Sequence, residues 1–151
     1  MRIKYILMAL CLMISSVCIA QDKLFEKYGE KDGVTSVYIS KAMFKMIPSL
    51  DIEDLNLKNM SEKINSMQIL SCEKRETAKE MENDFKKITG SYTELMRVKD
   101  DGDSVFFYTK QKGELIEELL MLVSEPDEFT VIRITGNFTI EDIQKITAKA
   151  S

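Results

Sequence analysis

Histidine is absent from the 151-residue sequence, and cysteine, proline and glycine are scarce. Histidine is the commonest general base and transition-metal ligand, so its absence excludes serine-histidine and cysteine-histidine nucleophilic sites. Three cysteines without any imidazole exclude the usual structural zinc sites, and no glycine-rich phosphate-binding loop is present. We therefore predict no catalytic residue, no cofactor-binding residue and no metal site.

A long apolar run is also missing, except for the short one at the amino terminus. Arg2 and Lys4 precede the apolar residues 6–17, a run that is shorter than the roughly 20 residues needed to span a bilayer. This pattern is typical of a cleaved secretory signal peptide over residues 1–20, with cleavage between Ala20 and Gln21. We expect an exported protein, periplasmic or extracellular, that has no stable membrane span after cleavage.

The mature chain, residues 21–151, is expected to form one domain. The leader holds two of the 21 basic residues and none of the 25 acidic ones, which leaves a net charge of −6. An acidic exported domain offers no positive field for nucleic acid, so nucleic acid is excluded as a partner. Cys72 is the only remaining thiol, so no internal disulfide can form, and we expect it to be buried and inert.

Helical and alternating patterns of apolar residues predict an α+β fold. The terminal helix is predicted from Thr139, which can cap it while Asp142 completes a capping box, and from the apolar spacing of Ile140, Ile143 and Ile146. The other predicted helices are residues 22–28, 41–47, 61–64 and 74–89, and the predicted strands are 34–40, 67–72, 94–99, 104–110, 115–123 and 129–135. Residues 49–59 receive no assignment.

The segment Leu115–Val123 fits either a strand or a helix. Its short links to strand-like neighbours favour a strand within a continuous meander. The predicted architecture is a mostly antiparallel sheet of about six strands, with a C-terminal four-strand meander. Helices are expected on one face, and the other face is expected to be at least partly free.

Four groups of residues could carry chemistry, and each has a simpler structural interpretation. Asp100, Asp101 and Asp103 could bind Ca²⁺, but aspartates around a glycine are also typical of a solvated hairpin turn, which we favour. Glu117 and Glu118 should point to opposite faces of a strand and have surface roles. Met43 and Met46, with the other methionines, could bind Cu(I), but methionine is usually core filler. Four aromatic residues could form a ligand platform on the open side of the sheet: Tyr38, Phe106, Phe107 and Tyr108. Alternation places Phe106 and Tyr108 on one face of their strand and Phe107 on the other, so we favour packing.

Several blocks of the sequence together resemble an exported family of the Bacteroidota known as domain of unknown function 4252. The blocks are DKLFEKY, GVTSVYISKAMFKMIP, SMQILSCE, SYTELMRVKDDGDSVFFY and EFTVIRITGNFTIEDIQKI. The resemblance implies a Gram-negative envelope, and a gene neighbourhood with extracytoplasmic-function sigma factors would imply an envelope-stress accessory role. It also makes Asp103-Ser104-Val105 resemble an O-glycosylation triplet of that phylum, which marks Ser104 as a possible modification site.

These observations lead to one functional hypothesis and two alternatives. The hypothesis is a non-catalytic exported domain that binds a protein or envelope component through a sheet face or edge. The first alternative is an enzyme of unfamiliar type that uses carboxylates, with Asp100, Asp101, Asp103 or Glu94 as candidates. The second is a carrier of an apolar ligand, which requires a cavity of at least ~300 Å³ between sheet and helices.

Overall fold

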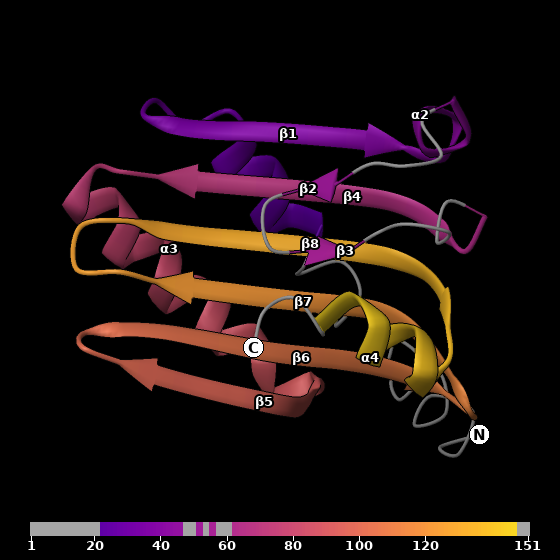
Figure 1. Cartoon of the computed structure of the whole chain (residues 1–151). Helices are drawn as coiled ribbons and strands as arrows, with labels where there is room; N and C mark the ends of the chain where they lie inside the picture. The colour runs from indigo at the N-terminus through magenta and orange to yellow at the C-terminus, as the bar shows by residue number, and fades with distance from the viewer. Residues whose placement is uncertain (1–21, 47–50, 53–54, 57–61, 148–151) are drawn as a thin grey trace, which may run out of the picture.

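The computed structural model describes residues 22–46, 51–52, 55–56 and 62–147 (Figure 1). The predicted signal peptide, residues 1–20, and its cleavage site at Ala20 and Gln21 lie outside this part of the chain. The fold that follows is therefore that of the predicted mature domain.

A six-stranded antiparallel sheet forms the centre of the molecule (Figure 1). The spatial order is β1-β4-β8-β7-β6-β5, so the last four strands in the chain form a continuous meander and β1 and β5 form the two edges. The predicted fold class is confirmed, as is the strand at Leu115–Val123. The strands are β1 (Val34–Ser40), β4 (Ile64–Cys72), β5 (Thr93–Asp100), β6 (Asp103–Lys112), β7 (Leu115–Ser124) and β8 (Phe129–Phe138).

Helices and one small hairpin complete the fold. The described part of the N-terminal helix covers residues 22–29. The other helices are α2 (Lys41–Met46), α3 (Arg75–Ile88), which continues into a 3-10 turn at Thr89–Ser91, and α4 (Ile140–Thr147). Two short strands, β2 (Asp51–Ile52) and β3 (Leu55–Asn56), pair within the stretch that had no predicted structure.

The predicted helix at residues 61–64 is wrong. Residues 62–63 form a turn, and Ile64 already begins β4, where it is fully buried and pairs with Gly136 of β8. Four residues cannot form a stable helix by themselves, because helix nucleation is unfavourable. Pairing with β8 therefore decides the conformation of this segment.

The two faces of the sheet carry separate hydrophobic clusters. We call the face packed against α3 and the N-terminal helix the α3 face, and its cluster includes Phe85 and Phe25 with Leu120 and Val131 of the sheet. This is the helix-covered face that the sequence predicts. On the opposite face, which we call the α4 face, Ile143 of α4 packs with its own set of sheet residues. In Figure 1, α4 lies in front of the sheet and α3 behind it, so α4 adds cover to part of the second face.

The structure differs from two expectations: that Met43 and Met46 fill the core, and that Ile140 shares an apolar face with Ile143. In α2, Phe44 is the buried residue, whereas Met43 is 47% exposed and Met46 is 78% exposed. In α4, Ile143 is buried but Ile140 is 63% exposed. A six-residue helix turns only one narrow stripe toward the sheet, and the large Phe44 ring occupies it. The methionines are therefore left on the surface beside β1.

Candidate functional site

The aspartates around Gly102 form the tight turn between β5 and β6. Asp100 pairs with Asp103, and the two residues between them, Asp101 and Gly102, both have positive φ values of 45° and 91°. A two-residue loop of this kind matches the twist of the adjoining strands, and an Asp-Gly pair adopts it readily. The favoured turn interpretation is therefore consistent with the structure. Within the described ranges, no group of three acidic or cysteine residues has the arrangement of a metal site.

Glu94, the fourth carboxylate of the enzyme hypothesis, is on the opposite end of β5. Its carboxylate accepts hydrogen bonds from Arg97 at 2.7 Å from Nε and 3.0 Å from Nη2. These hydrogen bonds hold the pKa of Glu94 below its ordinary value. The structure therefore separates Glu94 from the aspartates of the turn and pairs it with an arginine.

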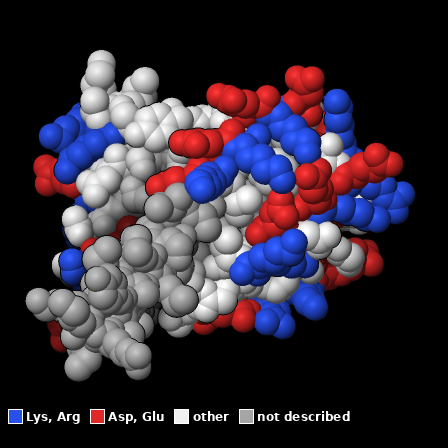
Figure 2. All heavy atoms as spheres, turned by 180° about the vertical axis from the view of Figure 1, so that it is seen from behind, with Lys and Arg blue, Asp and Glu red and all other residues white. Residues whose placement is uncertain are grey.

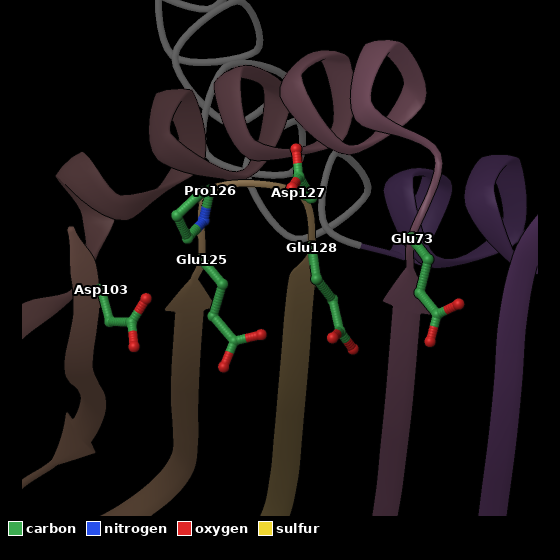
Figure 3. Close-up of a pocket in the computed structure, with 6 residues that line it drawn as sticks. All are labelled: Glu73, Asp103, Glu125, Pro126, Asp127 and Glu128. Carbon is green, nitrogen blue, oxygen red and sulfur yellow. The ribbon is translucent and has the colours of Figure 1, made fainter.

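A pocket of about 440 Å³ lies at one end of the sheet (Figure 3). Carboxylates from neighbouring strand ends point in one direction along it, and Asp127 points away from that row toward the helix (Figure 3). Glu128 also accepts a 2.8 Å hydrogen bond from the hydroxyl of Ser71. Such a pocket favours cationic groups over anions. Its lining residues are Glu73, Asp103, Glu125, Pro126, Asp127 and Glu128.

A buried polar cluster, which the sequence did not reveal, joins the sheet to the N-terminal helix. Glu118 is 6% exposed, and its Oε1 accepts hydrogen bonds from Arg133 Nε at 2.6 Å and from the Tyr92 hydroxyl at 2.8 Å. Arg133 also donates to Asp22 at 2.8 Å and to Gln68 at 3.3 Å. The predicted surface role of Glu118 is therefore wrong.

A β-bulge in β7 lies directly before Glu118. The register between β7 and β8 shifts between Ile116 and Glu118, and the register between β6 and β7 shifts nearby. A bulge inserts an extra residue and changes the face to which the following side chains point. Ile116 and Leu119 thus both pack on the α4 face, while Glu118 points to the α3 face beside Arg133.

Burial and charge set the ionisation of this cluster. Burial, followed by the negative charge and hydrogen bond of Glu118, raises the pKa of the Tyr92 phenol far above its ordinary value. Burial lowers the pKa of the Arg133 guanidinium, but attraction to Glu118 and Asp22 outweighs it and the net pKa is raised. The carboxylate and guanidinium neutralise each other, which fits a structural ion pair better than a general acid or base.

A second charged network crosses from the N-terminal helix to α3. The Tyr28 hydroxyl donates to Asp84 at 2.6 Å, and Lys27 contacts Asp84 at 2.9 Å and Glu80 at 3.3 Å. Burial and the hydrogen bond to Asp84 raise the pKa of Tyr28 to about 12. Figure 2 shows acidic and basic groups interspersed on this side of the molecule. This surface is mixed in charge rather than a patch of one sign.

The two edges of the sheet differ in chemistry. Strand β5 carries four charged residues and a register shift between Glu94 and Met96, both of which discourage pairing with another chain. Strand β1, VTSVYIS, contains no charged residue and pairs residue for residue with β4 from Val34 to Ser40. Val37 is 40% exposed and Tyr38 is 64% exposed. In the part of the chain that the structure describes, strand β1 is therefore an unprotected edge.

The remaining predicted candidates are separated in the structure. Cys72 is fully buried, as predicted, and its thiol lies 3.7 Å from the carbonyl oxygen of Lys74. Phe106 and Tyr108 pack on the α3 face and Phe107 on the α4 face, which confirms the packing interpretation for these three rings. For Tyr38 the packing interpretation is wrong, because its side chain lies on edge strand β1 and the residue is 64% exposed. Ser104, the predicted glycosylation site, is half-buried in β6 next to the β5–β6 turn. Its modification stays a prediction.

Comparison with known proteins identifies a family but no activity. The family model described as "Domain of unknown function (DUF4252)" matches residues 28–146. No curated protein and no solved structure matches the chain. In the part of the chain that the structure describes, none of the helices is long and apolar enough to cross a membrane. Any functional conclusion must therefore come from the surface itself.

Proposed function

Because the chain belongs to the DUF4252 family, whose description names no activity, we propose a function from the surface of the domain. The protein is an exported, non-catalytic domain that binds a protein or envelope component through edge strand β1. We place it in the periplasm or outside the cell, in a Bacteroidota-type envelope. The natural form of this binding role there is that of an envelope-stress accessory protein. The observation that carries the proposal is the uncharged, unprotected edge of β1.

The contrast between the two edges supports this proposal. Proteins usually protect an edge strand with charges or bulges, because its free N–H and C=O groups can pair with another chain. Strand β5 has both forms of protection, and β1 has neither form. Strand addition to such an edge provides main-chain hydrogen bonds, and the exposed side chains provide specificity.

The distribution of exposed apolar side chains supports the same edge. Among the residues that the structure describes, eight large hydrophobic residues are exposed, and four of them lie in β1 and the helix that follows it. These four are Val37, Tyr38, Met43 and Met46. Single exposed apolar residues are ordinary, but a group on one edge marks an interaction site.

The two alternatives receive less support. Of the four carboxylates in the enzyme hypothesis, only Asp103 reaches the acidic pocket, while Glu94 pairs with Arg97. The pocket is lined mainly by carboxylates, which do not suit an apolar ligand. A binding domain therefore remains the best account of the residues that the structure describes.

Export is tested by the intact mass of the protein isolated from its host. We expect a chain that begins at Gln21, since the predicted cleavage follows Ala20. A further mass of sugar units that disappears in the Ser104→Ala variant would establish glycosylation of Ser104. A mass equal to the unprocessed 151-residue chain would contradict export through a cleaved leader.

Binding through β1 is tested by photo-crosslinking in living cells. A benzoyl-phenylalanine in place of Tyr38, which is 64% exposed, should form a specific protein adduct. The matched control is the same group in place of Val98, which is 44% exposed on the other edge strand, β5. Adducts at position 38 that are no more abundant than those at position 98 would overturn the proposal.

A further inference from the structure

We propose that strand β1 pairs with β1 of a second copy of the chain. The two six-stranded sheets would then form one continuous antiparallel sheet across a two-fold axis. This inference rests on the proposed binding role of β1 and names its partner. The partner is a second copy because strand β1 is complementary to itself in sequence and in geometry.

The self-complementarity is centred on Val37. In an antiparallel pair about this residue, Val37 faces Val37, Thr35 faces Ile39, Ser36 faces Tyr38, and Val34 faces Ser40. Each position meets a β-branched, aromatic or hydroxyl side chain, types that form favourable cross-strand pairs. No like charges face each other, because the strand has no charges. A two-fold interface requires one patch to fit itself in this way.

The regular geometry of β1 supports such a pairing. Val34 to Ser40 pair with β4 without a shift in register, so the opposite side of the strand presents a regular row of main-chain groups. The Val34 amide already donates to the Lys31 carbonyl at 3.2 Å, so the pairing rests on the main-chain groups that follow it. The register also sets a defined antiparallel alignment, because a slip of one residue would exchange the two faces of the strand. On this alignment, Val37 would continue the α4 face on which its neighbour Ile69 lies.

Helix α2 extends the same interface. It begins at Lys41, directly after β1, so in an antiparallel pair it lies beside the start of the other copy's β1. That placement carries the exposed Met43 and Met46 toward the second copy. Methionine side chains adapt readily to a partner surface. The pairing therefore brings the exposed apolar residues of this edge near the second copy.

The first test measures the mass of the purified, host-processed protein in solution by sedimentation, from low to high micromolar concentration. We expect a reversible monomer–dimer equilibrium. Val37→Lys places two lysines opposite each other on the axis and should weaken dimerisation by about tenfold or more. The matched control is Val98→Lys on the other edge, and it should leave dimerisation unchanged. Far-UV circular dichroism checks that both variants are folded.

The second test does not depend on a destabilising change. Val37→Cys places two thiols opposite each other at the axis, and a short bis-maleimide reagent should join two copies. Val98→Cys should not form such a product, and Cys72 is fully buried, so the unchanged protein reports the background.

The outcomes separate the dimer from the broader proposal. A monomer at every concentration, or a dimer lost with Val98→Lys and kept with Val37→Lys, overturns the dimer. If position 38 crosslinks in cells only to a different protein, the binding role of β1 stands and the second copy is rejected. If position 38 crosslinks to nothing above the control, both are rejected.

Discussion

At the scale of single residues, a few polar groups lie in the interior. Whether each group has a partner decides how much free energy its burial costs. Glu118 and Arg133 are both largely buried, with side chains 8% and 14% exposed, and they bind each other. Thr109 is fully buried, and its hydroxyl has no hydrogen-bond partner among the described residues. A buried charge with a partner is tolerated, whereas a buried polar group without one costs free energy.

Removing one member of the ion pair should cost more than removing both. Arg133→Met leaves the Glu118 carboxylate buried with only Tyr92 as a partner, so we expect the free energy of unfolding to fall by about 3 kcal/mol. Arg133→Met combined with Glu118→Leu should recover much of that loss, since no buried charge remains unpaired: the Asp22 side chain, which loses Arg133, is 66% exposed to solvent. Urea denaturation of the two single variants and the double variant measures the coupling. Strictly additive losses would contradict this account.

Removing the unpaired hydroxyl should stabilise the protein. Thr109→Val keeps the shape of the side chain and removes a buried group without a partner, so we expect the free energy of unfolding to rise by about 1 kcal/mol. The control is Thr135→Val, because the Thr135 hydroxyl lies 2.6 Å from the Ser66 hydroxyl and its loss should destabilise by about 1 kcal/mol. Thermal denaturation distinguishes the two. Equal destabilisation by both variants would show that Thr109 has a partner in solution.

The burial of Glu118 also marks the limit of prediction at this scale. Its neighbours in the sequence, Glu117 and Leu119, predict an ordinary alternating strand, in which an acidic residue belongs on the surface. The side chain turns inward because it shares the α3 face with Leu120, two residues further on, and because Arg133 lies on the adjacent strand. The position of Arg133 depends on strand pairing, which leaves no signal within the segment itself.

At the scale of elements, α4 is held at its start by reciprocal capping. The Thr139 amide donates to Asp142 Oδ2 at 2.9 Å, and the Asp142 amide donates to Thr139 Oγ1 at 3.2 Å. Lys63 adds hydrogen bonds at 2.8 Å to both oxygens of Asp142 and so ties α4 to the turn before β4. The predicted capping box is confirmed, and the structure adds Lys63.

This cap should make the stability of the protein depend on pH. Burial raises the pKa of the Asp142 carboxyl, but hydrogen bonds from Lys63 and Thr139 outweigh it, so the folded pKa lies below the ordinary 3.8. A lowered folded pKa means that the stabilisation is fully present above about pH 4 and is lost as the pH falls through the folded pKa. Asp142→Asn should therefore be less stable than the parent at neutral pH.

The difference in unfolding free energy between the parent and Asp142→Asn should shrink as the pH falls. Urea denaturation from neutral pH to about pH 2 measures this difference. Other carboxyl groups with lowered pKa values, such as Asp84 and Glu80, titrate in both proteins and cancel from the comparison. A constant difference over the whole range would show that Asp142 stabilises α4 without its charge.

At the scale of the whole molecule, both hydrophobic clusters share the same strands. Leu119 and Ile134 belong to the cluster on the α4 face, while Leu120 and Val131 belong to the cluster on the α3 face. Neither cluster can lose the central strands β7 and β8 without exposing the other. The two layers of helices should therefore not unfold independently.

We accordingly expect a single cooperative unfolding transition. Far-UV circular dichroism follows the helices and the sheet. Fluorescence from the four tyrosines of residues 21–151, a chain without tryptophan, follows packing around groups such as Tyr28 and Tyr92. The two signals should change at the same urea concentration. Two separated transitions would show that one face of the sheet can lose its cover while the other remains intact.

The sequence by itself determined the class of the fold, the meander and most of the elements. Apolar periodicity, capping residues and turn residues act over a few neighbouring positions, so they can be recognised without knowledge of the fold. It also determined which familiar catalytic sites are excluded, because the absence of histidine does not depend on folding. Only the tertiary structure decided that β1 is an open edge, that Glu118 is buried and that α2 exposes its methionines. These features depend on which strands lie side by side, and such contacts join residues that are far apart in the chain.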